Sequence, residues 1–364
     1  MSLTKKLLEA IFTMWKSLSE TLTNMNVISA VSSTLFIIML GFFLRRKNIL
    51  TDQVGKTLSK VVLTVALPAL AFNSFMQNID GKTLSQGMNV LIWGILIYIL
   101  LILASPFLYK KLPKDKEEVL AVLTTFGSTT FFGIPIVGAV WGAKGVMYSS
   151  IFNIGYRIFL YSYAYIKLSG LKLEMKNIKQ MFLNPVVIAT FLGLFLWLAQ
   201  DLVPHISVLQ SSTKQTVDVA FYRIDLTAPW IYKPLTYLAN LASPLAWLAI
   251  GITLGSIPFK EAASDKLSWY YSFNKVVLVP LLNLALLALL TLTHILPVDN
   301  VALATVIVMM ATPTATVAAA YAIGFDRDAL LTSNASLIST FSAVIAIPIW
   351  IVILNLIAQT PIFN

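Results

Sequence analysis

Two segments of this sequence concentrate residue types that could bind a polar solute inside an otherwise apolar chain. They read Phe126-Gly127-Ser128-Thr129-Thr130-Phe131-Phe132-Gly133-Ile134-Pro135 and Ala311-Thr312-Pro313-Thr314-Ala315-Thr316. Glycine and proline interrupt helices, and an interrupted helix leaves amides and carbonyls free to join hydroxyl groups around a solute. We therefore expect helical hydrogen bonding to fail around 131–135 and 312–316. The candidate binding residues are Ser128, Thr129, Thr130, Pro135, Thr312, Pro313, Thr314 and Thr316. The alternative is that these small residues only allow close helix packing.

A charged residue near the centre of an apolar run is the second candidate feature. Arg157 lies in Asn153-Ile154-Gly155-Tyr156-Arg157, and no acidic residue lies at comparable depth in another run. An uncompensated guanidinium beside a cavity attracts an anion and can hold a carboxylate through two parallel hydrogen bonds. We predict that Arg157 and Asn153 bind substrate; alternatively, Arg157 is structural and bonds to carbonyls of a broken helix. Lys275 follows Trp269, Tyr270 and Tyr271, so we expect it to extend to the membrane interface.

Several kinds of chemistry are excluded by what the sequence lacks. It has no cysteine and two histidines, so thiol catalysis, disulfides and a metal-site motif are excluded. We find no catalytic constellation and no cofactor motif, and we expect no enzyme. A dedicated proton or sodium site normally needs a carboxylate within the membrane. Transport would therefore be driven by the substrate's own gradient, or by a proton carried on the substrate.

The elements that must position these residues are membrane-spanning helices. The 364 residues are 58% hydrophobic and only 12% charged, with a mean hydropathy of +0.81. Their apolar runs have the length of about twenty residues that a helix needs to cross a bilayer. The sequence predicts ten spans, at 25–44, 54–75, 87–109, 119–140, 145–168, 184–203, 235–256, 270–296, 301–324 and 329–357.

The distribution of basic residues predicts the orientation. Connections after odd-numbered spans hold fourteen lysines and arginines, and the other side holds eight. By the positive-inside rule, the odd-numbered connections are cytoplasmic and both termini are extracytoplasmic, in the cytoplasmic membrane of the cell. Because the basic residues lie in short connections, the net charge of +10 does not indicate nucleic-acid binding.

The two halves of the chain resemble each other. Gly41-Phe42-Phe43-Leu44 matches Gly193-Leu194-Phe195-Leu196, Ala66-Leu67-Pro68-Ala69-Leu70 matches Ala242-Ser243-Pro244-Leu245-Ala246, and Pro135 corresponds to Pro313. Five spans is an odd number, so the second copy enters the membrane from the opposite side, as in many secondary transporters. The predicted units are an amphipathic interfacial helix at 1–23, a first five-helix repeat at 24–168, a cytoplasmic linker at 169–183, a second repeat at 184–357 with an external insertion at 204–234, and a tail at 358–364.

These residues resemble the auxin efflux carrier family, whose bacterial members include malate and other organic-acid permeases. The matching segments cover about 25–357 and include Gly41 to Leu50, Ala66-Leu67-Pro68, Gly133-Ile134-Pro135, Asn184-Pro185, Lys275 with Pro280, Ala311-Thr312-Pro313 and Pro348. The resemblance implies an all-α polytopic membrane protein with a five-plus-five inverted repeat of the sodium/proton-antiporter and bile-acid-symporter type. It also implies crossed, broken spans 4 and 9, and a homodimer. Family members commonly have asparagine where this chain has Ser128, and also near Thr316.

The sequence thus predicts a secondary transporter in the lipid bilayer that carries a small organic anion, with malate the leading candidate. The solute would bind where spans 4 and 9 cross, and the transporter would work by alternating access. Two alternatives remain: a carrier of a neutral or weakly acidic solute, and a transporter-like membrane sensor or scaffold.

Overall fold

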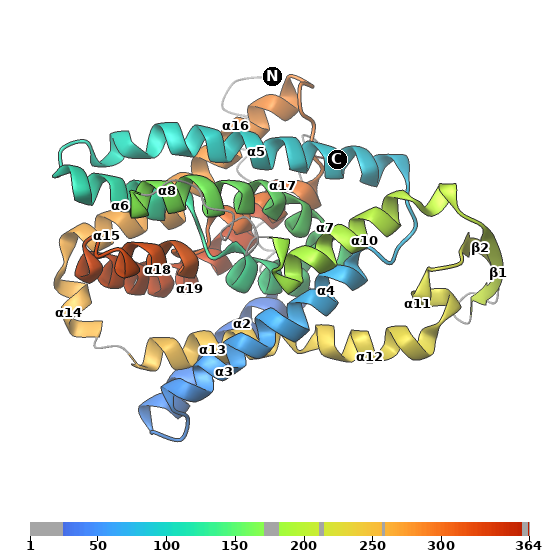
Figure 1. Cartoon of the computed structure of the whole chain (residues 1–364), viewed down its shortest axis with the longest axis horizontal. Coiled ribbons are helices and arrows are strands. Elements are labelled where there is room, and N and C mark those ends of the chain that lie inside the picture. Colours follow the sequence, from blue (N-terminus) through green and yellow to red (C-terminus); the bar gives the residue numbers. More distant parts are fainter. Residues whose placement is uncertain (1–24, 171–181, 211–214, 257–258, 359–362, 364) are drawn as a thin grey trace, which may run out of the picture.

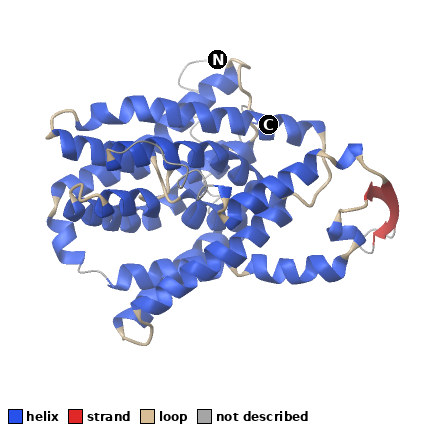
Figure 2. Cartoon of the chain, in the orientation of Figure 1, coloured by secondary structure: helices blue, strands red, loops and turns tan. Residues whose placement is uncertain are grey.

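The structure is a computed structural model that describes residues 25–170, 182–210, 215–256, 259–358 and 363. The amphipathic helix predicted at 1–23 lies outside these residues. The described chain is almost entirely helical (Figure 2). Six of its helical stretches are long and apolar enough to cross a membrane, namely Asp52–Ser74, Gly81–Tyr109, Thr129–Ser169, Pro229–Ser256, Lys266–Leu292 and Ala329–Ile357. The prediction of a polytopic α-helical membrane protein is therefore confirmed.

Several helices, among them α5, α12 and α13, run along the long axis of the molecule, whereas α3, α4 and α10 cross it obliquely (Figure 1). In the first half they are α2 (Met25–Arg46), α3 (Asp52–Val61), α4 (Leu67–Ser74), α5 (Gly81–Tyr109), α6 (Lys114–Thr125), α7 (Ile134–Phe159) and α8 (Tyr165–Ser169). In the second half they are α10 (Pro185–Leu198), α11 (Ile224–Thr227), α12 (Pro229–Asn240), α13 (Ala242–Ser256), α14 (Phe259–Ser264), α15 (Lys266–Phe273), α16 (Val279–Leu292), α17 (Asn300–Met310), α18 (Thr316–Gly324) and α19 (Ala329–Ile357).

Three of the prolines are accommodated by wide π turns. Each turn ends two residues before a proline: η1 (Val62–Ala66) before Pro68, η2 (Thr129–Gly133) before Pro135, and η5 (Asn274–Leu278) before Pro280. A proline ring clashes with the carbonyl four residues earlier and donates no hydrogen bond. In each case the residue before the proline donates to the carbonyl five residues back, and the helix continues. A further π turn, η3 (Leu160–Ala164), joins α7 to α8.

Glycines allow helices from the two halves of the chain to pack closely. Helix α2 packs along α13, where a side chain at Gly41 would overlap the Leu248 carbonyl and one at Gly251 would overlap the Ile38 carbonyl. Helix α10 packs along α4, where Gly193 lies against Phe75. The other helices form a second group, in which α5 packs on α7 and α15 on α19.

Helix α7 reverses direction at Gly142, where the predicted spans 119–140 and 145–168 meet. Gly142 has φ +62°, a conformation that L side chains rarely adopt. On either side of it, Gly138 contacts Val146 and Gly145 contacts Val137. Residues eight apart in one straight helix are separated by about 12 Å along its axis. The two arms of α7 therefore fold back on each other.

The insertion predicted at 204–234 contains the two strands of the described chain. Strands β1 (His205–Gln210) and β2 (Gln215–Ala220) pair antiparallel, with His205 opposite Ala220. The expectation of an all-α chain is wrong here, because β-branched residues alternate with polar ones in both strands and favour a sheet. Helix α12 begins at Pro229, within the range predicted for the insertion.

One buried arginine ties the insertion to the helices of both halves. Arg223 is 3% exposed and forms two hydrogen bonds with Asp225, at 2.8 and 2.7 Å. Its Nη1 also donates to Asn78, just after α4, at 2.6 Å and to Gln200, just after α10, at 3.1 Å. Arg223 therefore fixes the ends of α4 and α10 to each other at this end of the molecule.

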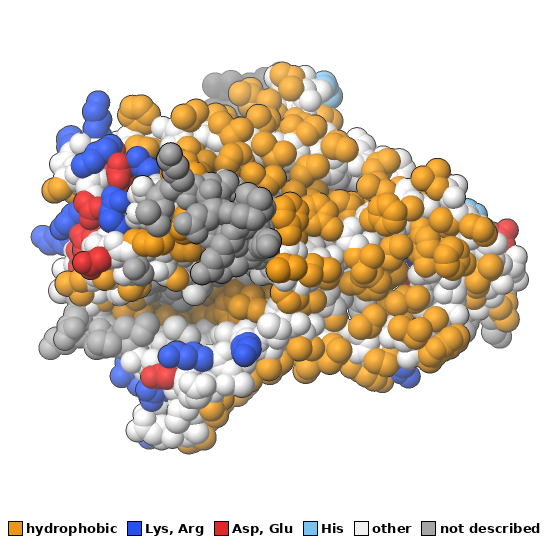
Figure 3. All heavy atoms as spheres, in the orientation of Figure 1, with side chains coloured by type: hydrophobic (Ala, Val, Ile, Leu, Met, Phe, Trp, Pro, Cys, Tyr) orange, Lys and Arg blue, Asp and Glu red, His pale blue; other side chains and the backbone are white. Residues whose placement is uncertain are grey.

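The opposite end is strongly charged. Figure 3 shows Lys, Arg, Asp and Glu gathered over the α5–α6 connection and the α2–α3 turn, with a broad hydrophobic surface between this end and the hairpin. We call the end that carries the α5–α6 connection and the α2–α3 turn the charged end. Glu118 there accepts hydrogen bonds from Lys167 and Arg327, both at 2.8 Å. Burial raises the pKa of Glu118, but the two hydrogen bonds and the positive charges of Lys167 and Arg327 together outweigh it, so the pKa lies below its usual value.

Candidate functional site

Two interrupted helices meet near the centre of the molecule. Helix α6 ends at Thr125 and helical structure resumes at Thr129; α17 ends at Met310 and α18 begins at Thr316. The two interruptions pair as a short antiparallel bridge between Gly127 and Thr314. Its hydrogen bonds run from Ser128 N to Pro313 O at 2.7 Å and from Ala315 N to Phe126 O at 3.0 Å. We call this paired region, 126–128 with 311–315, the crossing.

The first interruption lies earlier in the chain than the sequence predicts. Residues 131–135 were expected to lose helical hydrogen bonding, but they belong to η2 and the start of α7, so this prediction is wrong. The π turn absorbs the conflict at Pro135, and the chain opens instead at Gly127. A side chain at Gly127 would overlap the Thr312 hydroxyl, so glycine is required for the two segments to approach.

A small cavity of about 120 Å³ opens beside the crossing. Its lining residues are Leu63, Ser128, Thr130, Phe131, Tyr156, Arg157, Leu160, Tyr161, Asn184, Thr316 and Val317. We call it the inner cavity. Of the ten candidate residues, it brings together Ser128, Thr130, Arg157 and Thr316. Its size suits a small solute, since sites for drug-sized ligands occupy about 300–1,000 Å³.

Arg157 supplies the positive charge of the inner cavity. It is 7% exposed, and its Nη2 donates to the Thr130 hydroxyl at 3.2 Å. Asn153 Nδ2 lies 3.4 Å from the same hydroxyl oxygen. Among the described residues, Thr130 is the only hydrogen-bond partner of the guanidinium, which carries five N–H donors. A buried arginine with most of its donors unused has the properties of an anion-binding group.

The helix starting at Thr316 adds to this positive potential. The first amides of a helix have no partner within it and carry a partial positive charge. Thr316 is the first residue of α18 and lines the inner cavity with Arg157. Among the residues that the structure describes, no Asp or Glu lines the cavity. The field inside therefore favours a negatively charged group.

The remaining candidate residues surround the crossing and are not among those lining the cavity. Thr312 donates to the Met309 carbonyl at 2.7 Å, and Thr314 lies within hydrogen-bond distance of Tyr271 and Ser339. Thr129 is fully buried. The Pro313 carbonyl accepts from Ser128, and the Pro135 carbonyl accepts from Ser243 on α13 at 2.9 Å. These contacts hold the crossing together, and a direct role in binding stays a prediction.

Lys275 lies at the crossing, not at the membrane interface, so that prediction is wrong. It belongs to the π turn η5 and is 0% exposed. Its Nζ donates to the Thr124 carbonyl at 2.9 Å, in the last turn of α6, whose carbonyls lack helical partners. Tyr271 donates to the neighbouring Leu123 carbonyl at 3.1 Å. The ammonium thus caps the negative end of α6, a favourable place for a cation.

Comparison with known proteins places the chain in a family. A sequence model of the family described as membrane transport protein matches residues 26–351. The chain belongs to this family, which is the auxin efflux carrier family predicted above. An uncharacterized transporter of Methanothermobacter thermautotrophicus is 23% identical over 333 residues, or 89% of this chain and 97% of that protein. One from Methanocaldococcus jannaschii is 21% identical over 227 residues, 60% of this chain and 66% of that protein.

Several residues of this membrane transport protein's site were not among the predicted ones. Tyr156, Tyr161 and Leu63 line the inner cavity, and so does Asn184, whose Oδ1 also caps α10 by accepting from Val186 N at 3.0 Å. The sequence signal for Asn184 was the Asn184-Pro185 pair, a common start of a helix. The tyrosines gave no signal, because aromatic residues are frequent throughout the chain.

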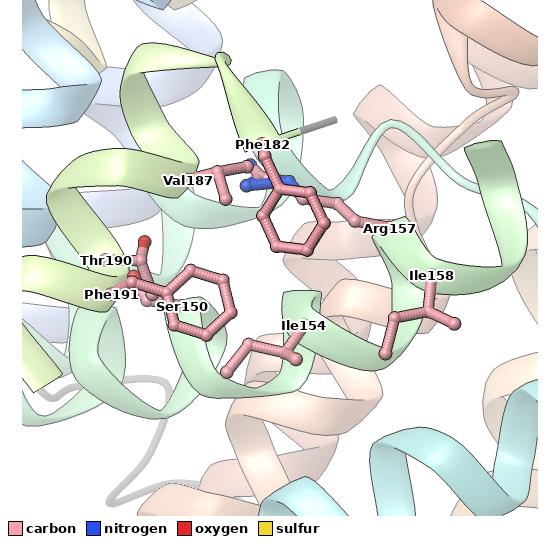
Figure 4. Close-up of a pocket in the computed structure, with 8 residues that line it drawn as sticks. All are labelled: Ser150, Ile154, Arg157, Ile158, Phe182, Val187, Thr190 and Phe191. Carbon is pink, nitrogen blue, oxygen red and sulfur yellow. The ribbon is translucent and has the colours of Figure 1, made fainter. Parts of the chain in front are cut away.

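Arg157 also borders a second, mainly apolar pocket of about 80 Å³ between α7 and α10. Figure 4 shows its lining residues, with the nitrogen-bearing end of Arg157 directed toward Phe182 and Val187. Ile154, Ile158 and Phe191 complete the apolar wall. The guanidinium of this membrane transport protein therefore lies between a polar and an apolar space.

Proposed function

We propose that this membrane transport protein is a secondary carrier of a small organic anion, which binds in the inner cavity. The observation that carries the proposal is that Arg157 and the first residue of α18 line the same cavity, which no acidic residue lines in the described part of the chain. Bidentate binding by the guanidinium would hold one carboxylate. The Ser128 and Thr130 hydroxyls and Thr316 would orient the rest of the solute.

Malate is the leading substrate. The family resemblance favours organic acids, and malate combines carboxylates for Arg157 and the α18 amides with a hydroxyl for the threonines. The carrier would be a uniporter, or would be coupled through a proton carried on the substrate, since no carboxylate of the described residues lines the cavity.

Two features support alternating access in a five-plus-five inverted repeat. The resemblance between the halves pairs α2 with α10 and α4 with α13. In the structure α2 packs on α13, and α10 packs on α4. The contact between α2 and α13 is therefore repeated by the contact between their counterparts, α10 and α4. The matched glycines Gly41 and Gly193 both lie at these contacts. The group formed by α2, α3, α4, α10, α12 and α13 would be the scaffold, and the helices around the crossing would move against it.

Uptake by purified protein in liposomes tests the function. We expect radiolabelled malate, among a panel of mono- and dicarboxylates, to accumulate above the level in protein-free liposomes. Failure of every carboxylate in the panel, with protein shown to be inserted and folded, would refute an organic-anion carrier.

A carrier of a neutral or weakly acidic solute is the second candidate. The apolar pocket beside Arg157 favours it, because a solute with an apolar body could occupy that space (Figure 4). Malamide has the shape of malate without its charge and separates the two candidates. An anion carrier takes up malate at least about tenfold faster, as expected for loss of a charged contact of 1.5–3 kcal/mol, whereas similar rates would favour the neutral solute.

We propose that the charged end is cytoplasmic and both termini are extracytoplasmic. This cysteine-free chain allows single cysteines to be introduced at Lys111, in the α5–α6 connection, and at Asp201, between α10 and the hairpin. A membrane-impermeant maleimide added to intact cells should label Asp201→Cys and should label Lys111→Cys only after permeabilisation. The opposite pattern would reverse the orientation.

A further inference from the structure

A wide groove runs between α3 and α13 and begins at the charged end. Its volume is about 550 Å³, larger than that of the inner cavity. Its lining residues are Asp52, Gly55, Lys56, Ser59, Lys60, Leu63, Thr64, Ile252, Thr253, Ser256 and Thr316. We call it the outer groove. The nine lining residues other than Leu63 and Thr316 do not line the inner cavity, so the groove needs its own explanation.

The outer groove and the inner cavity share two residues. Leu63, in the π turn η1, and Thr316, the first residue of α18, line both spaces. The groove therefore leads from the charged end to the edge of the inner cavity. Leu63 is an apolar side chain at the point where one space gives way to the other.

Charge along the groove is positive. Lys56 and Lys60 are one helical turn apart on α3, and both are exposed. Neither has a carboxylate within ion-pair distance in the described part of the chain. Asp52, the one acidic residue among the described residues that line the groove, is neutralised by Arg45 at 2.7 Å and also accepts a hydrogen bond from Ser256. Like charges four residues apart repel each other and destabilise a helix, so placing Lys60 next to Lys56 does not favour α3.

We propose that the outer groove is the path of the anion between the solution at the charged end and the inner cavity. Lys56 and Lys60 concentrate anions in the groove, and Leu63 separates the groove from the binding site. This inference rests on the proposed function, because it assigns a route to the same solute. Clefts lined by one sign of charge raise the local concentration and association rate of an oppositely charged solute by about 10–10³-fold.

The first test measures the potential in the groove without transport. Ser59 lies on the same wall, and Ser59→Cys would be the only cysteine of the chain. Its rates of modification by an anionic and a cationic methanethiosulfonate are compared in detergent-solubilised protein at low salt. Both reagents modify the same cysteine, so the ratio of their rates does not depend on how accessible this cysteine is in each variant. We expect Lys56→Gln/Lys60→Gln to lower the anionic-to-cationic ratio about tenfold, with the effect reduced in high salt.

The matched control removes the same charge elsewhere on the charged end. Lys110 and Lys111 are exposed in the α5–α6 connection and do not line the groove. Lys110→Gln/Lys111→Gln should leave the ratio within about twofold, because exposed charges beyond about one Debye length are screened. An unchanged ratio in the groove variant, or an equal fall in the control, would overturn the proposed potential.

The second test asks whether the anion uses this route. In liposomes at low salt, Lys56→Gln/Lys60→Gln should raise the KM for malate about threefold to tenfold with little change in kcat. A normal KM in this variant, with wild-type protein active, overturns the route while the proposed function stands. If wild-type protein transports no carboxylate but the modification ratio still falls, the proposed function fails and the route for an anion fails with it.

Discussion

Replacing Arg157 with glutamine should reduce malate uptake by at least about thirty-fold. Removing one partner of a desolvated charged contact costs about 2–5 kcal/mol. The guanidinium is buried beside the inner cavity, and the Thr130 hydroxyl is its only hydrogen-bond partner among the described residues. Most of its donors are therefore available to the substrate. Arg157→Lys should keep weak uptake, because a single ammonium replaces a planar fork that binds a carboxylate through two bonds.

The control for this measurement is Arg46→Gln, which removes the same charge from an exposed position at the end of α2. It should transport at a rate within about twofold of wild type, as expected of an exposed charge. Each variant is compared after its melting temperature and its amount in the liposomes have been measured. Normal uptake by folded Arg157→Gln would show that the arginine is structural, which is the alternative that the sequence left open.

The broad architecture could be predicted from composition alone, because long uncharged runs in lipid can only be helices. The exact position of an interruption could not. Proline at 135 and at 313 suggested two equivalent breaks, but the first proline follows a π turn and the second lies within the interruption. Whether a proline breaks a helix depends on whether the preceding turn can widen. Where the chain opens instead depends on a distant backbone partner. Gly127 pairs with Thr314, which is almost 190 residues later in the chain.

The candidate site was predicted in part. Arg157 was recognisable because a charge inside an apolar run is rare. The serines and threonines could not be sorted from sequence, since each has the same hydroxyl. Thr130 and Thr316 face the inner cavity, whereas Thr312 and Thr314 bond to groups of the protein itself. This division depends on which groups of other segments each hydroxyl meets in the fold, and the sequence of its own segment does not show those groups.

Lys275 shows why local context can mislead. Trp269, Tyr270 and Tyr271 precede it closely, a pattern typical of the membrane interface. The structure instead buries it, because η5 lies against the end of α6, whose carbonyls need a donor. The sequence contains no sign of that need, since α6 and η5 are about 150 residues apart.

Replacing Lys275 should therefore affect transport far more than stability. A buried ammonium without a carboxylate partner costs several kcal/mol in lost hydration. Its hydrogen bond to a carbonyl returns about 1.5–3 kcal/mol, and its position at the end of a helix returns up to about 2 kcal/mol. Because these terms nearly cancel, Lys275→Met should change the melting temperature by only a few degrees. Without the ammonium, the negative end of α6 faces the crossing uncompensated and opposes an approaching anion.

We expect malate uptake by Lys275→Met to fall about tenfold or more, because a helix end carries a partial charge of about −0.5. Lys275→Gln separates charge from hydrogen bonding, since its amide can still donate to the Thr124 carbonyl. If charge is what matters, both variants lose uptake equally; if the hydrogen bond matters, Lys275→Gln recovers it. Lys266→Gln, at the exposed start of α15, removes the same charge outside the crossing and should transport normally. Normal uptake in Lys275→Met would show that the lysine only fills space at the crossing, and that Arg157 and the α18 amides suffice to hold the anion.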